Sequence, residues 1–216
     1  MSEILFQTDI ETEQMALAEQ KNRQILDAAI AEFKEKGFAG ASMDRISERA
    51  QVSKRTVYNH FESKEALFQA INQCLFDKVQ AKLQITYNPE ASIKEELVRL
   101  GWAQSQVLLN PELFGMVRML LGELLRAPEL TANLNRRMDL VRIVARFLED
   151  AVKDGKLSIP NTYVAAEQYL GLVKERAFYP QIFGERVVSE TEFAAILEDT
   201  VNCFLSCYGT KSAVSA

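Results

Sequence analysis

The chain has 216 residues, of which 48% are hydrophobic and 25% are charged, and its formal net charge at pH 7 is -5. This composition suits one or two globular domains with a substantial core, and no apolar run approaches the roughly 18 residues that a membrane-spanning helix needs. The mild acidity excludes a broadly basic coat for nucleic acid, although an average can conceal a local patch. Long stretches rich in Ala, Leu and Glu, with few glycines and prolines between them, predict an all-α fold.

The charge is distributed unevenly along the chain. Residues 1–20 hold five acidic residues and no basic one, residues 21–71 hold nine basic and seven acidic, and residues 72–216 hold sixteen basic and eighteen acidic. Only the middle segment is positive. The first segment lacks the basic start and the apolar run of a signal peptide, so we predict that residues 1–20 form a polar, partly helical extension.

Short helices are predicted between residues 21 and 71. Apolar residues recur every four positions from Ile25 to Phe33, which indicates one face of a helix, and Gly37 is a natural stop for it. Three serines, Ser42, Ser53 and Ser63, stand where they can each cap a following helix. Short helices of which two are joined by a tight turn describe a helix-turn-helix unit, whose second helix enters the major groove of DNA.

The helix that follows Ser53 carries an unusual density of polar side chains. Val52 and Val57 must face inward to hold it in place. The side chains left to face outward are Lys54, Arg55, Thr56, Tyr58, Asn59 and His60. They offer donors to phosphates and forked or amide groups to base edges. Taken alone, such a run is also typical of a solvated helix face, but the surrounding helix-turn-helix pattern favours DNA contact.

The segment from Ile25 to Ile71 resembles the DNA-binding domain of the TetR/AcrR family of bacterial transcriptional regulators. The marks that carry this resemblance are the Gly-Phe turn at Gly37, the Val-Ser pair that precedes the third helix, and the Tyr-x-His-Phe-x-x-Lys motif that ends at Lys64. The resemblance implies that residues 42–61 form the helix-turn-helix. It also implies that Thr56, Tyr58, His60 and Lys64 contact DNA, mostly its backbone.

Two of the departures from the family pattern bear on structure or function. Gln51 stands where the family often has glycine, so the turn must accept a side chain with some backbone strain. Arg55 stands where a small residue is frequent, and it could fork onto a guanine or meet a phosphate. The full set of residues predicted to contact DNA is Ser42, Arg45, Lys54, Arg55, Thr56, Tyr58, Asn59, His60 and Lys64.

Nothing in the sequence indicates an enzyme, a metal site or a cofactor. The single histidine, His60, has no partner nucleophile or carboxylate cluster, so it is better interpreted as a phosphate donor or a packing residue. Cys74, Cys203 and Cys207 form no disulfide framework and no metal-binding spacing, and we expect small apolar side chains in a reducing cytoplasm, with a redox role as the alternative. No catalytic residue is predicted.

Several further helices are predicted in residues 81–216. The helix after Pro111 has a broad apolar arc and is expected to be largely buried, with Arg118 on its opposite side. Glu123 falls inside the arc and needs a partner there. It is expected either to pair with an arginine of a neighbouring helix or to anchor a ligand in a cavity.

Two C-terminal helices are predicted to form a four-helix bundle with a second copy of the chain. The segment after Thr162 has two apolar faces, and the helix from Thr191 to Tyr208 has an apolar arc wider than a surface helix needs. A single deeply buried helix is the alternative for the second of them. The residues predicted to form the dimer interface are Phe193, Leu197, Val201, Phe204, Leu205 and Tyr208. The TetR resemblance implies dimers of this kind, and the run "AAEQYLGLV" is similar to the AefR-like subgroup.

The resulting hypothesis is a homodimeric regulator that binds operator DNA, usually as a repressor, and is released by a small apolar or aromatic effector. The residues predicted to line the effector pocket are Trp102, Phe114, Met116, Met119, Glu123, Phe147, Tyr169 and Phe178, although such a stripe of Met and aromatic residues is more often ordinary core. The predicted organisation is an extension (1–20), a DNA-binding domain (21–80) and a ligand-binding and dimerisation domain (81–216). The alternative is a protein of the same fold that acts mainly through a protein partner.

Overall fold

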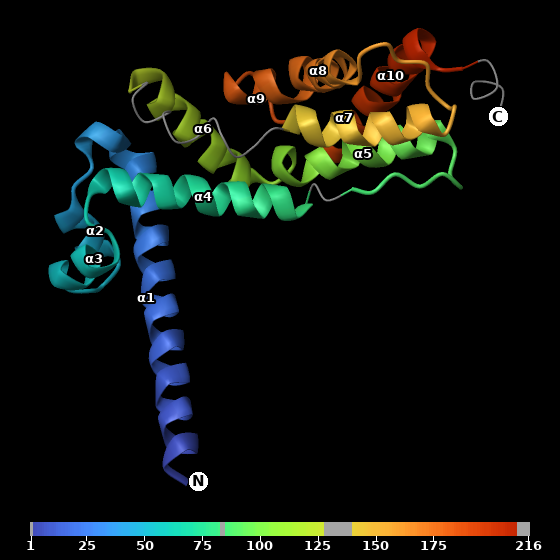
Figure 1. The fold of residues 1–216 in the computed structure, drawn as a ribbon. Helices are drawn as coiled ribbons and strands as arrows, with labels where there is room; N and C mark the ends of the chain where they lie inside the picture. The colour runs from blue at the N-terminus through green and yellow to red at the C-terminus, as the bar shows by residue number, and fades with distance from the viewer. Residues whose placement is uncertain (1, 83–84, 128–139, 211–216) are drawn as a thin grey trace. The chain divides into compact units, whose positions relative to one another are not determined.

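A computed structural model describes residues 2–82, 85–127 and 140–210. Every regular element in these ranges is a helix, apart from an isolated antiparallel bridge between Leu157 and Gly209, so the predicted all-α fold is confirmed (Figure 1). The elements are α1 (Ser2–Gly40), α2 (Met43–Arg49), α3 (Lys54–His60), α4 (Lys64–Lys82), α5 (Ile93–Leu108), α6 (Pro111–Arg126), α7 (Leu140–Lys153), α8 (Thr162–Val173), the π-helical turn η2 (Lys174–Phe178), α9 (Tyr179–Ile182) and α10 (Glu190–Tyr208).

The chain divides into two compact units. The N-terminal unit comprises residues 1–75 and 119–134, and the C-terminal unit comprises residues 76–118 and 135–216. Two helices therefore cross from one unit into the other, α4 near its middle and α6 after Arg118. The second half of α6 belongs to the same unit as α1, α2, α3 and the first part of α4, although it is distant from them in the sequence.

The N-terminal unit is held together by an aromatic cluster. The rings of Phe33, Phe38 and Phe68 contact one another with centroid separations of 5.2–5.9 Å. Phe38 reaches this cluster because α1 breaks at Gly37, whose φ of 69° lies in the left-handed region that favours glycine. The predicted end of the first helix at Gly37 is therefore seen as a break, followed by one short turn.

The predicted serine caps of the three following helices are all present. Ser42 accepts a hydrogen bond from the backbone N–H of Arg45, Ser53 from that of Thr56, and Ser63 from that of Ala66, at 3.0–3.2 Å. These bonds satisfy N–H groups that a helix start leaves unpaired. The local sequence signals therefore place the starts of α2, α3 and α4 correctly.

A buried carboxylate joins α1 to α2. Glu32 is 1% exposed, and its Oε1 accepts a hydrogen bond of 2.5 Å from Nε of Arg45, while its Oε2 lies 3.5 Å from Arg49. Arg49 also pairs with Glu35 at 2.6 Å. Hydrogen bonds from Lys36 and then from Arg49 lower the pKa of Glu35 to about 2. This network orients the first helix of the helix-turn-helix on α1.

The core of the C-terminal unit is formed by α5, α7, α8 and α10. Tyr169 of α8 is fully buried and donates a hydrogen bond of 2.7 Å to the carbonyl oxygen of Leu97. A Cβ at Gly101 would lie 2.3 Å from Cδ2 of Leu197, so α5 and α10 approach closely at this glycine. The tight packing leaves α10 deeply buried on this side.

Four of the six residues predicted to form the dimer interface belong to this core. Phe193, Leu197, Val201 and Phe204 are at most 2% exposed within a single chain, so the prediction is wrong for them. A side chain without exposed surface in one chain has none to offer to a second copy. The wide apolar arc of α10 reflects burial in its own unit, which is the alternative that the sequence left open.

Candidate nucleic-acid interface and neighbouring pocket

Helix α3 presents its polar side chains as the sequence predicts. Val57 is fully buried and holds the helix on the N-terminal unit. Lys54, Arg55, Tyr58 and Asn59 are exposed, whereas Thr56 and His60 are half-buried. The short helix therefore offers hydroxyl, amide, guanidinium and imidazole groups on its outer side, the set of groups that reads base edges and phosphates.

The turn between α2 and α3 depends on one strained residue. Gln51 has a φ of 55°, and it is the only non-glycine residue with positive φ in the described part of the chain. Its N–H donates to the carbonyl of Glu48, and that of Val52 donates to Ser47, which closes the end of α2. The strain expected at this position from the sequence is therefore present.

Replacing Gln51 with glycine is expected to give a net stabilisation of about 0.5–1 kcal/mol. Glycine has no Cβ and adopts this conformation without a clash, whereas the greater entropy that it gives to the unfolded chain removes part of the gain. Thermal unfolding measures this gain, and operator affinity should stay within about twofold. The same substitution at Gln24, an exposed residue within α1, is the control, and it should destabilise by about 1 kcal/mol. A loss of stability in Gln51→Gly would contradict the assignment of strain.

Most of the cations predicted to contact DNA have partners within the N-terminal unit. Lys54 pairs with Asp44 at 2.6 Å, and Arg45 binds Glu32 and the carbonyl of Gly40. The ammonium of Lys64 donates to the carbonyl of Ala41 at 3.2 Å and lies 4.6 Å from the ring centroid of Phe38. These side chains help to hold the unit together, whatever further contacts they make.

Arg55 differs from these residues. No hydrogen bond or ion pair ties it to the residues that the structure describes, and it lies exposed in the first turn of α3. Its guanidinium therefore keeps all its donors for an external acceptor. The adjacent Thr56 shares a hydrogen bond of 2.8 Å with the hydroxyl of Ser53.

A groove of about 350 Å³ separates α1 from α3. Its lining residues are Leu17, Ala18 and Lys21 from α1 and Thr56, Asn59 and His60 from α3. Lys21 was not among the predicted contacts. The available signal was the start of the basic segment at residue 21, but the sequence alone does not show which face of α1 lies toward α3.

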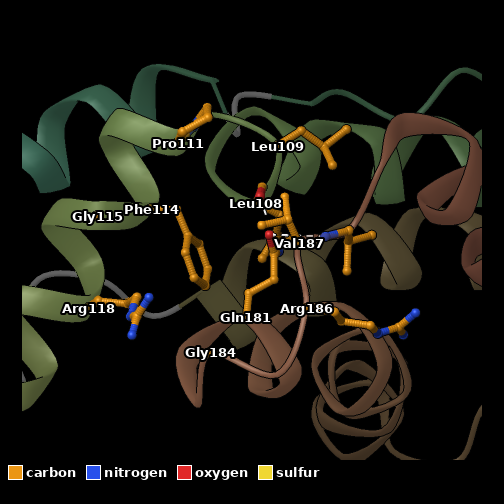
Figure 2. A pocket seen from close by; sticks show the side chains of 11 residues that line it. Leu108, Leu109, Pro111, Phe114, Gly115, Arg118, Gln181, Gly184, Arg186 and Val187 are labelled. Carbon is orange, nitrogen blue, oxygen red and sulfur yellow. Dashed lines mark hydrogen bonds between the residues drawn. The ribbon is translucent and has the colours of Figure 1, made fainter.

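A second hollow lies within the C-terminal unit, with a volume of about 330 Å³ (Figure 2). It is lined by Leu108, Leu109, Pro111, Phe114, Gly115, Arg118, Gln181, Gly184, Arg186, Val187 and Val188. Of the residues predicted to line an effector pocket, Phe114 alone is in this set. Arg118 was not predicted because it lies on the polar side of its helix, and Gln181 was not predicted because it belongs to no recognisable motif.

The other predicted pocket residues have different surroundings. Phe147 and Tyr169 are part of the core, and Trp102 is half-buried with its ring 5.3 Å from that of Phe193. Met116 is buried, Met119 is half-buried, and Phe178 packs edge-on against Phe114 at 5.7 Å. Apart from Phe114, the predicted residues therefore do not line this pocket, because large size and apolarity are also typical of ordinary core residues.

Glu123 pairs within its own helix. It is 5% exposed, and its Oε1 accepts a hydrogen bond of 2.8 Å from Arg126, three residues further along α6. The expected partner on a neighbouring helix is thus corrected, because i,i+3 spacing already brings the two groups together. Glu123 does not line the pocket of Figure 2, and its Oε1 lies 3.2 Å from where a Cβ on Gly37 would stand. The largely buried α6 is confirmed only in part, since Leu125 is 84% exposed.

Two absences among the described residues bear on other functions. No group of three or more His, Cys, Asp or Glu side chains in these ranges could hold a metal ion. No helix within the same ranges is long and apolar enough to cross a membrane.

A helix-turn-helix with an outward polar α3, joined to a larger helical unit, defines a DNA-binding transcriptional regulator. Residues 25–71 match the model of bacterial regulatory proteins of the tetR family, and residues 95–210 match the C-terminal domain of AefR-like transcriptional repressors. The chain therefore belongs to the TetR family, as its resemblance implied.

Similar proteins span nearly the whole chain. The transcriptional regulator UidR of Escherichia coli K12 is 32% identical over 88% of this chain and 95% of its own length. A TetR family regulator from Pseudomonas syringae pv. tomato has a TM-score of 0.75 and 35% identity, covering 88% of this chain and 97% of that one. The flavonoid-responsive regulator FrrA has a TM-score of 0.72 and 27% identity, over 88% and 98%.

Proposed function

We propose that this regulator is a homodimeric repressor that binds a two-fold operator and leaves it when a small molecule binds the C-terminal unit. The observation that carries the DNA-binding part is the exposed first turn of α3, where Arg55 has no partner among the described residues. The C-terminal match to AefR-like repressors supports repression. The similarity to FrrA, a flavonoid-responsive regulator, supports control by a small molecule.

On the operator, α3 lies in the major groove with its first turn toward the bases. Arg55 and Thr56 then read base edges, and Tyr58 and His60 bind the backbone near the end of the helix. Lys21, across the groove from His60, adds a cation on the α1 side. A phosphate beside this groove meets an ammonium, an amide and an imidazole together, which favours one docking register.

Dimerisation uses the outward faces of α8 and α9 rather than the buried residues of α10. Five of the large apolar side chains that remain exposed come from these helices and from the residue that directly follows α9: Tyr163, Val164, Leu172, Tyr179 and Phe183. Tyr179 and Phe183 stack with their ring centroids 6.4 Å apart. An exposed apolar surface of this kind is typical of a protein interface.

Exchanging Leu172 and Phe183 together for glutamate is expected to give folded monomers that bind operator at least about tenfold more weakly, because two half-sites are then no longer held by one particle. Both side chains are exposed, at 37% and 72%, so folding should survive. Sedimentation measures the oligomeric state. Leu125→Glu, at an 84% exposed position of α6, is the matched control and should stay dimeric. A double variant that is still a dimer would contradict the assignment of this interface.

Helix α6 connects the pocket to the N-terminal unit, and through it a bound ligand can promote release from DNA. Its first half lines the pocket of Figure 2 through Phe114 and Arg118, and its second half lies in the N-terminal unit, where Glu123 approaches Gly37. A ligand that displaces α6 lengthwise would act on the break in α1 that positions the helix-turn-helix. Coupling between two such sites is typically about 1–3 kcal/mol.

Footprinting on the DNA upstream of the protein's own gene tests the proposed function. The expected result is protection of two half-sites whose centres are about one helical turn, or a multiple of it, apart. Protection should weaken steeply as the salt concentration rises. No protection of any sequence over bulk DNA would favour the alternative, a protein of this fold that acts through a protein partner.

A further inference from the structure

The pocket of the C-terminal unit has a distinctive combination of walls and charge. Its apolar walls come from Leu108, Leu109, Pro111, Phe114, Val187 and Val188. Among the residues that the structure describes, the ionisable ones that line it are Arg118 and Arg186, and none of the described lining residues is acidic. A volume of about 330 Å³ lies at the lower end of the range for small-molecule sites.

The two arginines are not equivalent. Arg186 pairs with Glu192 at 3.1 Å and donates to the carbonyl of Arg176 at 3.0 Å, and in Figure 2 its side chain extends away from Phe114. Arg118 is exposed and forms no ion pair with the described residues. Its Nη2 lies 3.6 Å from where a Cβ on Gly184 would stand, so the guanidinium rests beside the turn that ends α9.

Both amide N–H groups of the remaining polar side chain of the pocket, Gln181, already have acceptors. Gln181 donates from Nε2 to the carbonyls of Leu108, at 3.2 Å, and Ala177, at 2.8 Å, and its Oε1 accepts from the N–H of Val188 at 3.3 Å. These bonds fasten the end of α5 to α9 and to the segment before α10. An anionic ligand therefore finds no free amide N–H in Gln181, and Arg118 is the described side chain left to donate hydrogen bonds to it.

We propose that this pocket binds a small amphipathic carboxylate, with the carboxylate on Arg118 and the apolar body against Phe114, Leu108 and Val188. A guanidinium binds a carboxylate with two parallel hydrogen bonds, which gives both strength and orientation. The Phe114 ring, already edge-on to Phe178 at 5.7 Å, supplies a flat apolar wall. This proposal names the effector class and rests on the proposed function only for the effect on DNA.

Binding of matched pairs of probes tests the proposal in the full chain without DNA. The probes are benzoate, phenylacetate, 1-naphthoate and octanoate, each beside its primary amide, followed by calorimetry and thermal unfolding. At least one carboxylate is expected to bind with a dissociation constant below about 5 mM and at least about tenfold more tightly than its amide, because the amide removes the charge and keeps the shape. Equal binding of acid and amide, or no binding by any acid, overturns the proposal.

Two arginine variants locate the contact. Arg118→Gln should weaken the bound carboxylate at least about tenfold and leave its amide unchanged. Arg186→Gln should weaken carboxylate binding clearly less than Arg118→Gln does, since that guanidinium already has partners in Glu192 and the Arg176 carbonyl. The reverse ranking of the two variants contradicts the assignment to Arg118. Both arginines are exposed, so the unfolding temperature of each free variant shows whether the fold is intact.

The DNA readout is separate. If a carboxylate binds as predicted but leaves operator affinity unchanged, the proposed binding site is supported and the proposed release of the operator by an effector is contradicted. If the chain binds the acid through Arg118 but binds no operator, only the DNA-binding part of the proposed function is contradicted.

Discussion

Arg55→Ala is expected to lower affinity for the operator by about 1–3 kcal/mol at each half-site, and to relax the preference for one base pair in each. The reason is the position of Arg55 in the first turn of α3, together with its freedom from partners among the described residues. A guanidinium that need not break an ion pair can fork onto a guanine at little additional cost. Affinity for unrelated DNA should fall much less, so the specificity ratio is the quantity to measure.

Lys54→Ala is the matched control for this variant, because Lys54 is adjacent and exposed but pairs with Asp44. It should weaken operator and unrelated DNA about equally, with at most about one unit lost from the salt slope per half-site. Lys64→Ala should behave similarly, with some loss of stability because its ammonium binds the Ala41 carbonyl. If Arg55→Ala weakened all DNA alike while Lys64→Ala changed the sequence preference, the docking of α3 would be wrong.

Glu32→Ala is expected to destabilise the N-terminal unit by about 3 kcal/mol, the lower end of the range for breaking a buried ion pair. Glu32 is 1% exposed and holds Arg45 and Arg49, so its loss leaves both guanidinium groups without this partner and removes two of the side-chain contacts between α2 and α1. The lower figure applies because the arginines are partly exposed, at 47% and 38%. Thermal unfolding and operator binding should both be impaired.

Glu35→Ala is the control for that variant. Glu35 lies on the same helix and also pairs with Arg49, but it is half exposed, so its loss should change stability little. Arg45 was predicted to contact DNA, and a double variant separates the two roles. Adding Glu32→Gln to Arg45→Ala should restore stability, since no buried charge is then left unpaired. Operator affinity that recovers with it assigns Arg45 to structure, and affinity that stays low assigns it to DNA.

Much of the N-terminal unit could be predicted from the sequence because its signals are local. A capping serine acts within three residues, an apolar stripe repeats every three or four, and glycine at a helix end is favoured by its own backbone. Ser42, Ser53 and Ser63 therefore marked three helix starts, Gly37 marked the break in α1, and Val57 marked the inward side of α3. The TetR resemblance followed from residues 25–71, and the all-α fold followed from the composition of the whole chain.

The partners of charged and apolar side chains were not open to prediction in this way, because they lie far apart in the sequence. Three features depend on which helix faces the fold brings together. They are the pairing of Arg45 with Glu32, the bond from Lys64 to the Ala41 carbonyl, and the lack of a partner for Arg55 among the described residues. An apolar arc likewise shows that a helix is buried without showing what covers it, which is why α10 was assigned to a dimer interface although its own unit buries Phe193 and Phe204. The periodicity of apolar residues shows which face of a helix is buried. Packing between segments that are distant in the sequence decides which other surface covers that face.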